Sequence, residues 1–118
     1  MKKLFITMGL VLTTASSVFA MTFNEAKLQN KPVVIMFHTH GCSACKKFAP
    51  IFDKMASKFS GKFNFVKEDG NHSDIAKSLN FMYVPAIFIV EPKTMKAKRI
   101  EDDCAWDNGC FIETLQKY

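Results

Sequence analysis

A Cys-x-x-Cys motif, formed by Cys42 and Cys45, is the feature of this sequence best suited to chemistry. It follows the apolar run Val33–Phe37 closely and begins a predicted helix. The first N–H groups of a helix are unpaired and its dipole favours negative charge, which stabilises a thiolate at Cys42. Cys45 lies one turn deeper, where its thiol could attack a mixed disulfide formed at Cys42. This placement predicts thiol–disulfide exchange, with Cys42 as nucleophile and Cys45 as resolving thiol.

Basic side chains near the motif could tune the Cys42 thiolate. Lys46 falls in the first turn of the predicted helix and adds positive potential. His40 precedes Cys42 by two residues, and a protonated histidine there would lower the pKa of the thiol and make it pH-sensitive near neutrality. For either residue the alternative is a solvated side chain without a role.

A different chemistry is open to the same residues, because His38, His40, Cys42 and Cys45 together could bind Cu(I) or Zn²⁺. The alternative function is therefore a periplasmic copper or zinc carrier. A second pair of metal ligands with suitable spacing is missing, since five residues separate Cys104 from Cys110. We favour redox chemistry and assign no metal site.

The other two cysteines, Cys104 and Cys110, flank Trp106. Four cysteines allow three connectivities, and the short spacings favour the two local pairs. A Cys104–Cys110 disulfide would close a small loop and hold the last helix, stabilising the fold by ~2–3 kcal/mol. We expect a structural disulfide, with a second redox pair as the alternative. Trp106 is either a core residue or an exposed contact for a client protein.

Residues 1–20 have the pattern of a secretory signal peptide: a basic start, a short apolar run, and small residues before the cleavage point at Ala20. We therefore expect residues 21–118 to form one soluble domain that is exported, most simply to the periplasm. Thiols in an oxidising compartment tend to become disulfides.

The composition sets further limits on function. The 118 residues include 16 Lys+Arg and 11 Asp+Glu, and 48% are hydrophobic, which requires a packed core. Without Lys2 and Lys3 the balance is 14 against 11, a net charge of +3. The basic residues near 93–99 are followed at once by acidic residues 101–103 and have no interleaved aromatic side chains, so we expect no nucleic-acid binding.

Hydrophobic periodicity predicts the elements that position the cysteines. Helices are expected at 22–30, 44–59 and 73–79, with a last helix from Asp107 or Asn108; strands are expected at 33–37, 63–66, 86–90 and 95–100. Residues 67–71 read as a polar turn and residues 101–106 as a polar loop. This order predicts an α/β fold, a mixed sheet with helices on both faces.

Residues 33–90 resemble the thioredoxin family in three features: the Cys-x-x-Cys motif between a strand and a helix, Pro50 five residues after Cys45, and the pair Val84-Pro85 before a strand. The resemblance implies a thioredoxin-like domain at 21–118, with a four-stranded central sheet and helices on both faces. It also implies a cis peptide bond before Pro85 and backbone hydrogen bonds from Val84 to a client strand, and a cis X-Pro bond costs only ~0.5–1 kcal/mol.

For function, the resemblance implies a thiol:disulfide oxidoreductase that acts on the thiols or disulfides of client proteins. We expect this protein to need no organic cofactor, to exchange electrons with a membrane redox partner, and to act as a reductant or isomerase more readily than as a strong oxidant. Met36 stands where many members have a buried aspartate, and Lys67 or Glu68 could substitute for that acid. The residues between Cys42 and Cys45 match neither typical reductants nor a strong oxidant, so the sequence does not reveal the redox potential.

Overall fold

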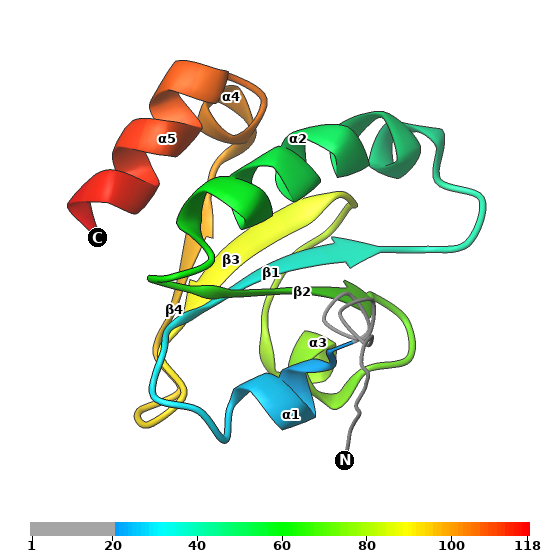
Figure 1. The fold of residues 1–118 in the computed structure, drawn as a ribbon. Helices are drawn as coiled ribbons and strands as arrows, with labels where there is room; N and C mark the ends of the chain where they lie inside the picture. Colours follow the sequence, from blue (N-terminus) through cyan, green and yellow to red (C-terminus); the bar gives the residue numbers. More distant parts are fainter. Residues whose placement is uncertain (1–20) are drawn as a thin grey trace, which may run out of the picture.

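The computed structural model describes residues 21–118, so the predicted signal peptide, 1–20, lies outside the described residues. Figure 1 shows the elements in chain order: α1 (Phe23–Ala26), β1 (Val33–His38), α2 (Ser43–Phe59), β2 (Asn64–Asp69), α3 (Asp74–Ser78), β3 (Ala86–Val90), β4 (Ala97–Ile100), α4 (Asp102–Ala105) and α5 (Asn108–Lys117). Most predicted elements are present, and their bounds differ mainly at the polar ends.

The four strands form one mixed sheet in the order β2-β1-β3-β4. β1 pairs in parallel with β2 and antiparallel with β3, and β3 pairs antiparallel with β4. Helices α2 and α5 lie over one face of the sheet, and α1 and α3 lie over the other (Figure 1). The predicted four-stranded sheet with helices on both faces is therefore confirmed.

The central strand β1 is buried on both of its faces, which explains its continuous apolar run. Val34 and Met36 belong to the core under α2 and α5, whereas Val33, Ile35 and Phe37 belong to the core beside α1 and α3. This double burial fixes the strand firmly, and the end of β1 leads directly to the cysteine motif.

Strand β2 is longer than its apolar residues predict. Residues 67–69, expected in a turn, continue the strand because they pair in parallel with β1 up to His38. Their polar side chains find partners on this edge strand: Lys67 Nζ lies 2.9 Å from Asp53 Oδ1, and Glu68 Oε2 accepts a hydrogen bond from Phe23 N at 2.7 Å. Tertiary contacts therefore extend the strand beyond its apolar run.

Two short helices also differ from the prediction. Helix α1 ends at Ala26 rather than at residue 30, although the expected capping box between Thr22 and Glu25 is present. The expected polar loop 101–106 contains α4, and α5 begins after Asp107, whose carboxylate caps it. Within residues 21–118, no helix has the length and apolarity needed to cross a membrane.

Candidate active site

Cys42 is the N-cap residue of α2. Its Sγ accepts a hydrogen bond from the backbone N–H of Cys45 at 3.0 Å. Gly41 precedes it with φ of +78°, a left-handed conformation that glycine adopts readily and that turns the chain from β1 into α2. The expected position of Cys42 at the helix N-terminus is confirmed, and a thiolate there would be stabilised by the first helical N–H groups.

Cys42 and Cys45 form a disulfide, with their Cα atoms 5.3 Å apart. The two sulfurs differ in exposure, because Cys42 is half-buried at the surface whereas Cys45 belongs to the core at 5% exposure. An incoming molecule can therefore reach Cys42 and not Cys45. This difference matches the predicted roles of nucleophile and resolving thiol.

The loop before β3 lies against the cysteine pair. Its Val84–Pro85 peptide bond is cis, and the Val84 carbonyl oxygen lies 3.9 Å from Cys42 Sγ. Pro85 is buried, while Val84 is half-buried and packs against both halves of the core. The backbone of Val84 thus borders the sulfur that an incoming molecule can reach.

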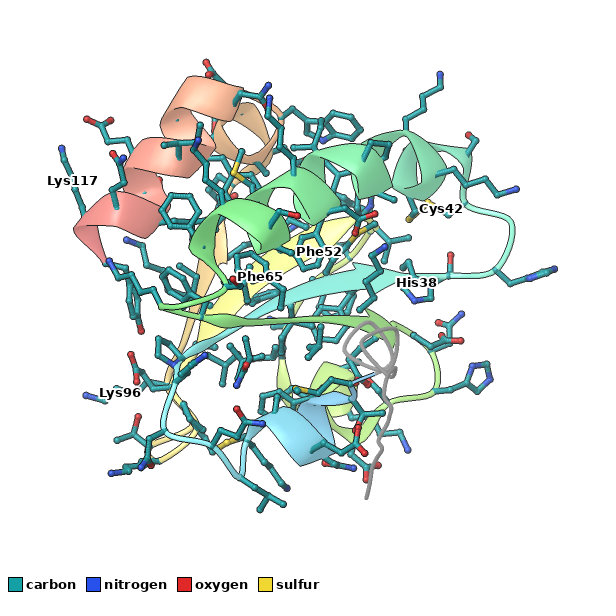
Figure 2. The ribbon with its side chains drawn as sticks, viewed as in Figure 1. His38, Cys42, Phe52, Phe65, Lys96 and Lys117 are labelled. Atoms are coloured by element: carbon teal, nitrogen blue, oxygen red, sulfur yellow. A yellow bond between two sulfur atoms is a disulfide. The ribbon has the colours of Figure 1, made fainter. Side chains whose placement is uncertain are left out.

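A hollow of about 400 Å³ opens beside the disulfide. It is lined by Met36, His38, Thr39, His40, Gly41, Cys42, Cys45, Lys46, Ala49, Lys67 and Asp69. Figure 2 shows His38 and Cys42 at the same end of the molecule. The structure therefore brings His38, His40 and Lys46 to the cysteines, and tuning of the thiolate by His40 and Lys46 stays a prediction.

Only one of the two proposed substitutes for the buried aspartate faces this hollow. Lys67 lies opposite Met36 in the β1–β2 register and lines the hollow. Glu68 is the next residue along β2, so its side chain points to the other face, where it binds Phe23 N. The expectation that Glu68 could replace the aspartate is therefore wrong.

Asp69 is the carboxylate of β2 that lines the hollow, and the sequence reasoning missed it. A hydrogen bond from Asn71 N, supported by one with His72, lowers the pKa of Asp69 and keeps its charge. Strand alternation places residue 69 on the same side as residue 67, so Asp69 could have been predicted to face the hollow. The expectation of a turn at residues 67–71 prevented this prediction.

The alternative metal site receives no support from the side-chain arrangement. In the described part of the chain, no three His, Cys, Asp or Glu residues are grouped so that they could hold a metal ion. His38 and His40 lie near the cysteine pair without completing such a set.

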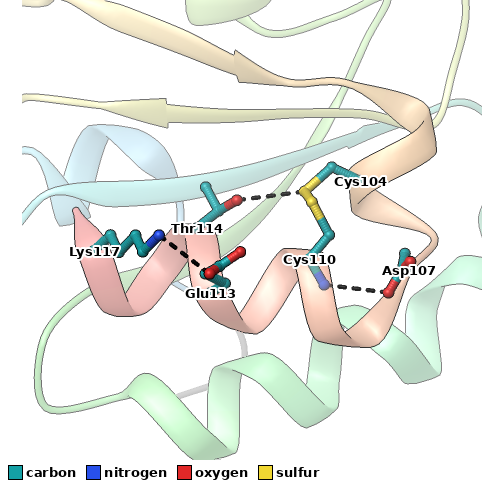
Figure 3. The surroundings of a disulfide bond; sticks show 6 residues. All are labelled: Cys104, Asp107, Cys110, Glu113, Thr114 and Lys117. Atoms are coloured by element: carbon teal, nitrogen blue, oxygen red, sulfur yellow. Dashed lines mark hydrogen bonds and ion pairs between the residues drawn. A yellow bond between two sulfur atoms is a disulfide. The ribbon is translucent and has the colours of Figure 1, made fainter.

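Cys104 and Cys110 form the second disulfide, which joins α4 to the first turn of α5 (Figure 3). Their Cα atoms are 5.1 Å apart, and Thr114 Oγ1 lies 3.3 Å from Cys104 Sγ. Asp107 Oδ1 accepts a hydrogen bond from Cys110 N at 3.2 Å. The cysteines thus pair as their spacing suggests, and the bond holds the segment between the two helices.

Trp106, in the same segment, combines the two roles considered for it. Its ring packs edge-to-face on Phe48 of α2, with the centroids 4.9 Å apart. The residue still exposes 42% of its surface. It therefore packs against the core with one part and faces solvent with the other.

Comparison with known proteins places this geometry in a family. The sequence model described as Thioredoxin matches residues 12–107. Thioredoxin H2 of Arabidopsis thaliana is 33% identical over 89 residues, which cover 75% of this chain and 63% of that protein. Thioredoxin of Borreliella burgdorferi is 29% identical over 62 residues, 52% of this chain and 53% of the relative.

Solved structures agree with the sequence comparison. The thioredoxin NaTrxh from Nicotiana alata has 25% identity and a TM-score of 0.63, over 80% of this chain and 79% of that one. The first thioredoxin domain of mouse protein disulfide-isomerase A4 has 20% identity and a TM-score of 0.67, over 80% and 68% of the two chains, and this match shows the fold alone. With its fold, its cysteine motif and a family match over most of its length, the chain belongs to the thioredoxin family.

Proposed function

We propose that this protein is an exported thiol:disulfide oxidoreductase that exchanges the Cys42–Cys45 dithiol and disulfide with client proteins. The observation that carries the proposal is the unequal exposure of the pair: Cys42 is reachable at the helix N-terminus and Cys45 is buried behind it. Family membership supports it, and this chain spans 53% and 63% of the two thioredoxins compared above.

In the reducing direction, the Cys42 thiolate attacks one sulfur of a client disulfide. A bond forms between Cys42 Sγ and that sulfur, the client disulfide breaks, and the second client sulfur leaves as a thiolate that takes up a proton. The helix N-terminus stabilises the attacking thiolate. We expect the backbone of Val84, whose carbonyl oxygen lies 3.9 Å from Cys42 Sγ, to pair with the extended client segment.

Cys45 then resolves the mixed disulfide. Its thiol loses a proton, its sulfur attacks Cys42 Sγ, and the client leaves with its second sulfur reduced. Two electrons have then passed to the client, and the protein holds the Cys42–Cys45 disulfide. Met36 cannot accept the proton of Cys45. We propose that this proton passes to solvent through the hollow that Lys67 and Asp69 line.

For the direction of electron flow, we propose a reductant or isomerase. The relatives include proteins named thioredoxin and a probable protein disulfide-isomerase ER-60 of Schistosoma mansoni, 27% identical over 83% of this chain and 21% of that protein. Repeated turnover requires a donor of electrons, for which a membrane redox partner is the proposed source. A reduction potential near those of thioredoxin or protein disulfide isomerase (~−270 to ~−180 mV) would support this direction, and ~−120 mV would contradict it.

Export to the periplasm is proposed from the pattern of residues 1–20. Expression of the full chain in a bacterium with an outer membrane should give a periplasmic protein whose N-terminal residue is Met21. An uncleaved protein in the cytoplasmic fraction would contradict export and would leave the redox activity to be judged separately.

The activity is tested by reduction of insulin disulfides with dithiothreitol as electron donor. We expect the unsubstituted protein to accelerate the reaction and Cys42→Ser to remove the acceleration, because no other sulfur of the pair is accessible. The Cys104→Ser/Cys110→Ser variant serves as the matched control and should remain active. Full activity in Cys42→Ser would overturn the proposal.

A further inference from the structure

We propose that Tyr83 is a specificity-determining residue, whose ring packs against an apolar side chain of the client near the client's reacting cysteine. This inference rests on the proposed function and names the class of client segment that the site prefers. It concerns the residue directly before Val84, whose carbonyl oxygen borders Cys42 Sγ.

Tyr83 and Met82 form a bulky exposed pair that directly precedes Val84 in the chain. Tyr83 is 53% exposed and Met82 is 93% exposed. Single exposed apolar residues are common on protein surfaces, but a consecutive pair that leads into a client-binding backbone is a candidate contact surface. When a client pairs with a backbone as an extended strand, pockets and surfaces for its side chains give the specificity.

The Tyr83 ring packs against the side chain of Arg99. The guanidinium carbon of Arg99 lies 4.9 Å from the centroid of the ring, an arrangement typical of a cation–π contact. Arg99 in turn lies 5.7 Å from the Phe88 ring on β3. A flexible surface tyrosine is thereby stacked on the sheet, so little side-chain freedom remains to be lost when a client binds.

The charged groups next to the Tyr83 ring, on Arg99 and Asp102, lie close to each other. Arg99 Nη2 lies 3.9 Å from Asp102 Oδ1, and within residues 21–118 Arg99 Nε and Nη2 are buried without a hydrogen-bond partner. A tyrosine hydroxyl is neutral at physiological pH. A hydrogen bond with Asp102, followed by the negative charge of that residue, raises the pKa of Tyr83 further. The surface left for the client is therefore an uncharged aromatic ring beside Met82.

Such a surface favours an apolar partner. A Phe side chain of the client can form an aromatic pair with the Tyr83 ring, and a Leu side chain can bury apolar area against it. Either contact predicts a preference of about two- to tenfold in rate for an apolar over a small polar client residue.

The test uses symmetrical disulfide-linked peptide dimers that are identical except for the residue before or after cysteine, which is Leu, Phe or Ser. Second-order rate constants are measured with the reduced full-length protein. We expect the unsubstituted protein to react about two- to tenfold faster with the Leu and Phe peptides than with the Ser peptides at one of the two positions. Tyr83→Ala should react with all peptides at similar rates, whereas Tyr83→Phe should retain the preference.

Two further variants separate a specific contact from a general loss of structure. Arg99→Met should weaken the preference and leave the Cys42–Cys45 reduction potential unchanged, because Arg99 acts through the Tyr83 ring. Leu28→Ala changes another exposed apolar residue, 83% exposed, and should keep the preference. Equal rates for all peptides in the unsubstituted protein, or an unchanged preference in Tyr83→Ala, would overturn the inference alone. A protein that reduces no peptide would contradict the proposed function as well.

Discussion

At the scale of single residues, Gly41 sets the position of the reactive sulfur. Its φ of +78° costs little for glycine and ~1–2 kcal/mol for a residue with a Cβ. A Cβ at Gly41 would meet no atom within 4 Å, so the cost of a substitution is purely conformational. Another residue here would tend to change the angle at which the chain enters α2 and presents Cys42.

We expect Gly41→Ala to lower the free energy of unfolding by about 1–2 kcal/mol, measured by urea denaturation of the oxidised protein. Gly61→Ala is the matched control, because its Cβ would also meet no atom within 4 Å and its φ is not left-handed. This control should be neutral or slightly stabilising, since alanine restricts the unfolded chain. Equal losses in the two variants would show that the φ of Gly41 is not the cause.

Residues whose chemistry is local can be assigned from the sequence, whereas residues with distant partners cannot. The roles proposed for Cys42 and Cys45 are predicted from a motif at the start of a helix, because the chemistry of a helix N-terminus is local. The contact between Tyr83 and Arg99 could not be predicted in the same way, since it joins the loop before β3 to the neighbouring strand β4. The same holds for Glu68, whose partner, Phe23 N, lies in α1.

At the scale of elements, the Cys104–Cys110 disulfide joins α4 and α5 over the face of the sheet that α2 covers (Figure 1). Helix α4 has no side-chain cap at Glu101 and is only one turn long, so it is unstable by itself. The disulfide and the packing of Ala105 in the core compensate for this. Helix α4 therefore depends on a covalent bond and on tertiary contacts, which explains why the polar sequence of residues 101–106 predicts a loop.

Replacing both cysteines of this bond tests its role. We expect Cys104→Ala/Cys110→Ala to lower the free energy of unfolding by about 2 kcal/mol, the loop-closure entropy for a short loop, in urea denaturation. Initial rates of insulin reduction should stay within about twofold of the unsubstituted protein, in line with a structural role. A loss of activity at a temperature where the variant is folded would instead support the alternative of a second redox pair.

The predicted and observed bounds of the strands differ most where a strand contains polar side chains. The apolar part of β2 is recognisable from its pattern, but residues 67–69 belong to the strand only through pairing with β1 and through contacts to Asp53 and Phe23. The buried strand β3 matches its predicted bounds, 86–90, because apolar residues fill it entirely. A continuous apolar run predicts a buried strand, whereas the sequence pattern does not reveal the partners of polar residues on an edge strand.

At the scale of the whole molecule, the end of α5 is tied to two distant connections. The Tyr118 hydroxyl donates a hydrogen bond to Glu91, in the turn between β3 and β4. Lys62, between α2 and β2, donates hydrogen bonds from Nζ to the carbonyl oxygens of Leu115 and Gln116 at 2.8 and 3.0 Å. These contacts fasten the last helix at the end of the molecule opposite the cysteine motif (Figure 2).

The Tyr118 contact predicts a stability change at high pH. Burial, and then the hydrogen bond with Glu91 and its negative charge, raise the pKa of Tyr118 from 10.0 to about 12. The folded state therefore favours neutral Tyr118, and this contribution is complete below pH 10 and is lost as pH rises to about 12. Tyr118→Phe should be less stable than the unsubstituted protein at pH 8, with a smaller difference at pH 12, in urea denaturation at both values. A difference that does not change with pH would contradict the linkage.

Cys42 is proposed to be the sulfur that reacts with the client, and a trapping experiment can identify that sulfur. Cys45→Ser removes the resolving thiol, so a mixed disulfide with a client should accumulate. Peptide mapping by mass spectrometry of the trapped adduct should find the client bonded to Cys42. Client bonded to Cys104 or Cys110, or no adduct in Cys45→Ser, would show that Cys42 is not the attacking sulfur.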